Sequence, residues 1–346
     1  MTCKDSIMNA LEKLLNEKQI LLADGATGTN LFQIGLESGY PPELWNDEHP
    51  EKIEWLHNGF LDAGADIILT NSFGGTKHRL KLHDAQDRVH ELNVKAAQIA
   101  RKCADQYDRD IIIAGSMGPT GELLEPVGAL SFDEAVEAFT EQANALKEGG
   151  ADIAWIETMS AENEVRAAAK AAQNAGLDYV FTMSFDTAGK SMMGVAPDAM
   201  VEFAKSMDPK PHACGANCGV GASDMVASAL VMTDVEDAPI IVAKGNCGIP
   251  EFKEGELMYT GTPEVMAEYA RTAIDSGVRI IGGCCGTSFE HLKAMRDAID
   301  SHEKRDKPNL EEIEQRLGHF TSQPSKTQSK ESDGKEAPAR RRRRRG

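Results

Sequence analysis

The sequence lacks any long hydrophobic run. No segment approaches the roughly 20 consecutive apolar residues of a membrane-spanning helix, and the charged start, residues 1–5, offers no apolar stretch suited to a secretory signal. The seven cysteines are an odd number, which without an export signal favours reduced thiols over a disulfide framework. These absences predict a cytoplasmic protein that does not associate with membranes and whose thiols are available for a metal or for catalysis.

Basic residues are also scarce over most of the chain. The 37 Lys and Arg face 55 Asp and Glu, for a formal net charge of -18. Residues 321–346 hold nine of the basic and three of the acidic residues, which leaves 28 basic against 52 acidic residues in 1–320. Because affinity for nucleic acid rests on Lys and Arg, residues 1–320 are not expected to bind it.

One local pattern repeats along the chain: an amphipathic helix ends at glycine, and a short β-branched or apolar run follows. Glycine closes a helix in the left-handed conformation, and a tight turn then starts a strand. The expected strands are residues 20–23, 67–70, 111–114, 153–156, 179–181, 212–215, 240–243 and 279–281. Strands that alternate with helices imply a parallel sheet, and eight of them favour an α/β fold of the closed (β/α)8 type, a TIM barrel, over a doubly wound open sheet.

The pattern stops after about residue 305. We therefore predict a barrel domain over residues 1–305 and a mostly disordered tail over residues 306–346, whose Ser, Lys, Pro and Arg cannot offset the entropy of ordering. Residues 311–317 can add a short helix. The six arginines of residues 340–345 could dock an acidic partner, bind nucleic acid or lie on the acidic barrel surface, with a solvated tail as the default.

Three cysteines follow strand ends, where TIM barrels form their active sites. Cys218 follows the sixth expected strand, and Cys284 and Cys285 follow the eighth, so a closed barrel brings them to one rim. Three thiolates around Zn²⁺ leave one tetrahedral position open, as in catalytic zinc sites. A catalytic zinc site is therefore one interpretation of these residues.

The cysteine pair also fits buried packing or a redox role. Adjacent cysteines in an extended strand point to opposite faces, so sharing one metal requires a bend, which Gly282, Gly283 and Gly286 permit. Cys247, at the end of the seventh strand, is a competing ligand, while Cys214 lies earlier in its strand and fits packing.

Four segments in the expected order resemble the homocysteine-binding domain family: residues 24–29 (Asp-Gly-Ala-Thr-Gly-Thr), 118–122 (Gly-Pro-Thr-Gly-Glu), 215–218 (Gly-Ala-Asn-Cys) and 282–287 (Gly-Gly-Cys-Cys-Gly-Thr). That family includes betaine-homocysteine methyltransferase, enzymes that use S-methylmethionine, and the first module of cobalamin-dependent methionine synthase. The resemblance covers about residues 12–300. It implies an enzyme that methylates the homocysteine thiol to give methionine, with zinc held by Cys218, Cys284 and Cys285.

The same resemblance implies a substrate site. Asp24, Gly25 and Glu157 match residues that hold the amino-acid end of homocysteine, where a carboxylate complements the ammonium group. Asp24 also fits a turn or a helix cap, and Glu157 also fits a structural role.

The methyl donor is less well indicated. Trp45 matches one aromatic residue of the cage that surrounds the cation in betaine enzymes, and it also fits a partly buried loop anchor. The two other cage positions are tyrosines in the family and fall here on Gly74 and Thr158, which departs from the pattern. Residues 244–252 and the barrel-only length resemble bacterial proteins grouped with the betaine enzymes, so betaine, giving dimethylglycine, is the favoured donor.

Three alternatives remain open from the sequence. The chain could be the homocysteine-binding component of a split cobalamin-dependent methionine synthase, taking the methyl group from a corrinoid protein. It could be a non-catalytic zinc- or thiol-binding protein, which would not need Asp24 and Glu157. A barrel aldolase or lyase would want a Schiff-base lysine, and Lys244 is the only lysine at a strand end.

Overall fold

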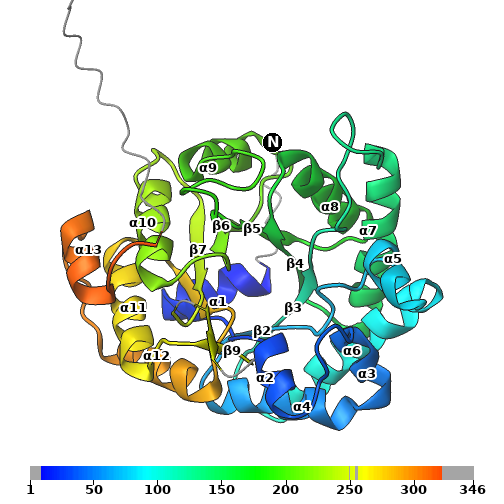
Figure 1. Ribbon diagram of the computed structural model, residues 1–346, viewed down its shortest axis with the longest axis horizontal. Helices are drawn as coiled ribbons and strands as arrows, with labels where there is room; N and C mark the ends of the chain where they lie inside the picture. The colour runs from blue at the N-terminus through cyan, green and yellow to red at the C-terminus, as the bar shows by residue number, and fades with distance from the viewer. Residues whose placement is uncertain (1–8, 249, 254–255, 322–346) are drawn as a thin grey trace, which may run out of the picture.

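The computed structural model describes residues 9–248, 250–253 and 256–321. Eight parallel strands form a nearly closed barrel with helices around it (Figure 1), which confirms the predicted TIM barrel. Cys3, the predicted tail beyond residue 321 and its arginine run lie outside the described residues. Within the described ranges, no helix combines the length and the apolar character needed to cross a membrane.

The barrel strands lie in the order β1, β10, β7, β6, β5, β4, β3, β2, and every hydrogen-bonded pair among them is parallel. They span Leu21–Leu22 (β1), Ile67–Leu69 (β2), Ile112–Met117 (β3), Ile153–Met159 (β4), Tyr179–Met183 (β5), Ala213–Asn217 (β6), Ile240–Gly245 (β7) and Ile280–Gly283 (β10). All eight predicted strands are therefore confirmed. An antiparallel hairpin that was not predicted, β8 (Pro250–Lys253) with β9 (Glu256–Tyr259), lies between β7 and the next helix.

Most helices connect successive strands and cover the outside of the barrel, whereas α1 lies across one end of it (Figure 1). The α-helices are α1 (Ala10–Lys18), α2 (Gly28–Gln33), α3 (Trp45–Glu48), α4 (Pro50–Asp62), α5 (Lys77–Leu80), α6 (Val89–Ala104), α7 (Phe132–Gly149), α8 (Glu162–Asn174), α9 (Pro197–Ser206), α10 (Ala222–Thr233), α11 (Pro263–Asp275), α12 (Phe289–Ser301) and α13 (Leu310–Leu317). Three short 3-10 helices complete the set: η1 (Pro42–Leu44), η2 (Lys81–His83) and η3 (Gln86–Arg88).

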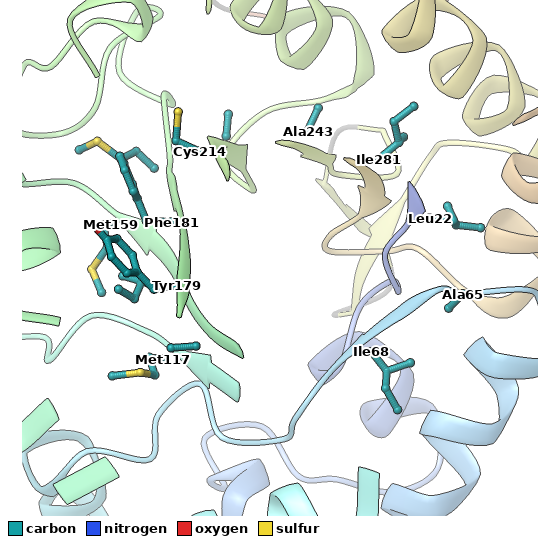
Figure 2. Packing of buried hydrophobic residues seen from close by; sticks show 14 of the residues in the cluster. Leu22, Ala65, Ile68, Met117, Met159, Tyr179, Phe181, Cys214, Ala243 and Ile281 are labelled. Carbon is teal, nitrogen blue, oxygen red and sulfur yellow. The ribbon is translucent and has the colours of Figure 1, made fainter. Parts of the chain in front are cut away.

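Successive strand residues point to opposite sides of the barrel wall and so form two apolar layers. Leu21 and Ile280 belong to the cluster inside the barrel, which the leucines of α1 close at one end. Leu22 and Ile281 belong to the layer between strands and helices. Figure 2 shows this outer layer, with Leu22, Ile68 and Ile281 pointing from their strands toward the helices. Because both faces of the wall are buried, the strands are continuous apolar runs in the sequence.

Strand pairing in the barrel wall is shortest at the seam between β1 and β2. A single bridge, Ala23 with Ile67, joins the two strands. A buried side chain supplements it, because the Asp66 carboxylate accepts a hydrogen bond from the Leu22 amide at 2.9 Å. Arg296 on α12 pairs with the same carboxylate at 3.1 Å. Side-chain bonds thus hold the seam together where strand pairing is short.

Packed structure continues past the predicted domain boundary at residue 305. The short helix expected near residues 311–317 is present as α13, and its Ile313 is fully buried. Arg316 bonds to the buried carboxylate of Asp275 on α11 at 3.2 Å. Residues 306–321 are therefore anchored on the barrel.

Candidate functional site

A cavity of about 580 Å³ lies at the C-terminal ends of the barrel strands. Residues that follow or end four different strands meet there, as expected for a TIM barrel. The cavity is lined by all six residues predicted for metal and homocysteine binding: Asp24, Gly25, Glu157, Cys218, Cys284 and Cys285.

The three predicted metal ligands form a cluster. The sulfur atoms of Cys218, Cys284 and Cys285 all lie within 4.8 Å of one another, and the Sγ atoms of Cys218 and Cys285 are 3.8 Å apart. The hydrogen bond with Cys218 lowers the pKa of the Cys285 thiol and raises the pKa of Cys284. Three soft sulfur atoms at one point are a donor set that suits zinc.

Local backbone turns bring these sulfurs together. Cys218 has a φ of 59°, a left-handed conformation that is uncommon outside glycine and that turns the chain sharply after β6. In the other segment Gly282 and Gly283 remain in β10, and Gly286 supplies the turn with a φ of 81°. A Cβ at Gly286 would come within 2.4 Å of Tyr259, so glycine also lets that ring approach the cluster.

A buried ion pair lies at the base of the cavity. The Lys244 Nζ at the end of β7 donates to Asp24 Oδ1 at 2.7 Å, and both side chains are 3% exposed. Asp24 Oδ2 accepts a hydrogen bond from the Leu69 amide of β2 at 2.7 Å. Burial alone would lower the pKa of Lys244, but the nearby carboxylates of Asp24 and Glu157 raise it above its ordinary value. Lys244 is thus a charged partner of Asp24, which does not fit the Schiff-base alternative.

Glu157 is the second acidic group of the cavity. It sits within β4, is 9% exposed, and its Oε1 accepts a hydrogen bond from the Ser116 hydroxyl at 2.5 Å. Burial raises the pKa of Glu157, while Lys244 and Ser116 oppose that rise. No hydrogen bond to Oε2 occurs among the described residues, so this oxygen is the one that can accept a ligand.

A polar network that the sequence did not suggest fixes the surroundings of Glu157 and Cys218. Thr158, next to Glu157, has a φ of 61° and donates its amide to Asn217 Oδ1 at 2.8 Å. The Asn217 amide group donates in return to Thr158 Oγ1 at 2.7 Å. Asn217 directly precedes Cys218, so these two bonds connect the acidic residue of β4 to the cysteine after β6.

Gly25 allows two segments to pack against each other. A Cβ at this position would lie 2.7 Å from the Phe60 ring and 2.8 Å from the carbonyl oxygen of Thr287. The turn after β1 therefore rests directly on the residues that follow the cysteine pair, and a hydrogen bond from the Ala26 amide to the same carbonyl strengthens this contact.

Trp45 is not brought to the cavity. It is buried in the core at 4% exposure and is absent from the described residues that line the cavity. The Lys52 ammonium lies 3.9 Å from the centre of its ring, and His49 packs edge-on against it. Trp45 thus anchors the segment between η1 and α4, whereas Gly74 and Thr158, the other two expected cage positions, do line the cavity.

The remaining cysteines stand apart from the cluster. Cys247 is fully buried against Gly261, and burial raises the pKa of its thiol to about 12. Cys214 is likewise buried in the outer layer. The cluster in the described part of the chain is therefore formed by the three predicted cysteines. Tyr259, whose hydroxyl bonds to Cys285, was missed because it ends the unpredicted hairpin.

Known proteins resemble this chain over most of its length. The model of the homocysteine S-methyltransferase family matches residues 21–299. The structure of the homocysteine methyltransferase MmuM from Escherichia coli is similar in its oxidized form, with a TM-score of 0.70 and 24% identity over 84% of this chain and 99% of that chain. Its metallated form gives a TM-score of 0.69 at the same identity and coverage. A methyltransferase from Methanosarcina mazei is more distant, with a TM-score of 0.53 and 14% identity over 85% and 98% of the two chains.

We expect the Asp24 and Lys244 side chains to be energetically coupled. Lys244→Met should lower the free energy of unfolding by about 3 to 5 kcal/mol, because it leaves a buried carboxylate without its partner. Asp24→Asn in the same chain should recover part of this loss, with a coupling of about 0.5 to 3 kcal/mol. Urea unfolding of both single variants and the double variant measures this coupling. The exposed pair Lys13 and Asp110 is the matched control, and additive effects at Asp24 and Lys244 would refute the coupling.

Proposed function

Because the chain belongs to the homocysteine S-methyltransferase family, we propose that it transfers a methyl group to the thiol of homocysteine on a zinc site formed by Cys218, Cys284 and Cys285. The observation that carries this proposal is the meeting of three sulfur atoms within 4.8 Å in a cavity that two buried carboxylates also line. Methionine is the product. Betaine is the favoured donor and leaves as dimethylglycine.

The donor set of the cluster fits zinc. Cys218, Cys284 and Cys285 supply three sulfur ligands, and three protein ligands are the number that leaves a tetrahedral position for a substrate. Zinc bound there would remove the proton of the homocysteine thiol and hold the sulfur as a nucleophilic thiolate.

The carboxylates of the cavity bind the amino-acid end of homocysteine. Glu157 Oε2 accepts a hydrogen bond from the substrate ammonium, a charge-assisted contact. Asp24 already bonds to Lys244 and Leu69, so it contributes negative charge and a fixed turn at Gly25. Burial raises the pKa of both acidic groups, and the charge of Lys244 opposes this rise and so favours their ionised forms.

The transfer itself is a displacement at the methyl carbon. The homocysteine sulfur forms a bond to a methyl group of betaine as the bond from that carbon to nitrogen breaks. The electron pair of the broken bond stays on nitrogen, so dimethylglycine leaves without the positive charge of the quaternary nitrogen. The chain's task is to hold the sulfur and the methyl group in line and within reach of each other.

A second donor is supported by one observation. Gly74 and Thr158 line the cavity where betaine enzymes carry tyrosines, and this loss of aromatic faces favours a methylated corrinoid carried by a separate protein. A zinc- or thiol-binding protein without turnover would not need the buried acidic pair of Asp24 and Glu157.

We expect zinc binding to require the three clustered cysteines and not the other cysteines of the chain. Purified protein should hold about one zinc per chain after dialysis, and Cys285→Ala should lose most of it, because two protein ligands hold the ion weakly. Cys247→Ala is the matched control and should keep its zinc, since Cys247 lies outside the cluster. Metal analysis by mass spectrometry measures both. Full zinc in Cys285→Ala would exclude this site.

Glu157→Ala should weaken homocysteine binding about 10- to 100-fold, because a charge-assisted hydrogen bond is lost. The zinc content of the variant should not change. Calorimetric titration of zinc-loaded protein with homocysteine measures the affinity. Glu164→Ala is the control, since Glu164 is a buried acid that bonds to Thr120 instead of lining the cavity. An unaltered affinity of Glu157→Ala for homocysteine would show that Glu157 does not bind the substrate ammonium.

The donor is tested by turnover. Zinc-loaded protein with homocysteine and betaine should form methionine and dimethylglycine in equal amounts, measured by chromatography. Formation of methionine from methylcobalamin but not from betaine would reverse the order of the two donors. Absence of methionine with every donor, despite homocysteine binding, would support the non-catalytic alternative.

A further inference from the structure

The wall of the cavity away from the cysteines carries charges that neither the metal nor homocysteine requires. It is formed by residues from α2 to the end of η1 and by residues from the loop after β2 to α5. Its chemistry is mixed, because Phe32, Tyr40 and Phe73 offer apolar faces while Glu43 and Arg79 offer one charge of each sign. We call these five residues the outer wall.

Glu43 is a buried carboxylate that faces the cavity. Its residue is 5% exposed, and Oε1 accepts a hydrogen bond from the Gly74 amide at 2.6 Å. Burial raises the pKa of Glu43, and the backbone hydrogen bonds together with Arg79 and His83 oppose that rise. A Cβ at position 74 would lie only 2.9 Å from Glu43 Oε1. The Glu43 carboxylate thus fills the space that a side chain at Gly74 would enter, and Gly74 is the position that matches a cage tyrosine of betaine enzymes.

Arg79 lies on α5 and lines the same cavity. Its guanidinium forms no hydrogen bond or ion pair with any residue that the structure describes. It is close enough to Glu43 to lower the pKa of that carboxyl, yet the two do not form a direct ion pair. A guanidinium without a partner beside a cavity is suited to a carboxylate ligand, since its fork matches the two oxygens.

We propose that the outer wall binds a small zwitterionic onium acid as methyl donor, with Arg79 on its carboxylate and Glu43 beside its cationic centre. This rests on the proposed function, and it moves donor recognition away from Trp45. A quaternary ammonium or sulfonium centre has no N–H to donate, so it is recognised by negative charge and by aromatic faces. Glu43 supplies the charge, and Tyr40 and Phe73 supply the faces.

The two charges of the outer wall also determine which ligands it selects. The separated charges of Arg79 and Glu43 favour a ligand that carries one negative and one positive group. A ligand with a single charge binds more weakly, because the other charged side chain of the wall loses its water without gaining a partner. Betaine and dimethylsulfonioacetate carry both charges. Trimethylsulfonium has the cation alone, and 3,3-dimethylbutanoate has the shape and carboxylate of betaine without the cation.

Two variants of zinc-loaded, full-length protein separate the two roles. Arg79→Met should raise the KM for betaine and for dimethylsulfonioacetate about 10- to 100-fold, the loss of one charge-assisted contact, and leave the KM for trimethylsulfonium within about twofold. Glu43→Gln should raise the KM for all three cations. It should not weaken inhibition by 3,3-dimethylbutanoate. Lys81→Met removes a cation from the adjoining η2 and is the control, with unchanged kinetics.

The outcomes distinguish this inference from the proposed function. Normal turnover with betaine and no selective effect of Arg79→Met would overturn the inference and leave the function intact. Methionine from methylcobalamin alone, with zinc and homocysteine bound normally, would overturn the inference and the choice of betaine together. Calorimetric homocysteine affinity that is unchanged in both variants separates a donor role from general damage to the site.

Discussion

The carboxylate of Asp24 is the group on which the barrel and its site both depend. It bonds to Lys244 at the end of β7 and to the Leu69 amide of β2, so one side chain joins three strands at the C-terminal rim. A buried carboxylate is tolerated only when it is paired and hydrogen-bonded. Because β1 and β2 share a single bridge, the same bonds that satisfy this charge also close the seam.

This arrangement constrains what the cavity can bind. Both oxygens of Asp24 are engaged inside the protein, whereas Glu157 lines the cavity and its Oε2 accepts no hydrogen bond from the described residues. Under the proposed function, Glu157 is then the direct partner of the substrate ammonium, and Asp24 acts through position and charge. Lys244 supplies a buried positive charge beside the three cysteines and the two carboxylates. Without it, the substrate ammonium would have to compensate the acidic groups alone, and the folded site would be less stable.

The sequence predicted the features that depend on interactions between neighbouring residues. Glycine-terminated helices followed by apolar runs indicated all eight strands, and strand ends placed the cysteines on one rim. Features that depend on contacts between distant segments were not predicted. The ion pair between Asp24 and Lys244 joins residues 220 positions apart, and Tyr259 reaches the cluster only through an added hairpin. The surroundings of Trp45 were not predicted either, because the Lys52 ammonium that contacts its ring comes from the next helix, α4.

The two halves of the cavity differ in how they are built, and that difference explains why one was easier to predict. Glu157 and Cys218 sit on or directly after barrel strands, whose positions are set by closure of the sheet. Glu43 and Arg79 sit on short helical turns in loops, whose positions depend on packing that no local pattern encodes. Loops can change without disturbing the barrel. In the proposed site, the strand ends can therefore keep the same thiol substrate while the charged residues of the outer wall change. In the proposed donor site, the Glu43 carboxylate attracts the cation beside Gly74, where betaine enzymes carry a tyrosine, while Tyr40 and Phe73 supply ring faces.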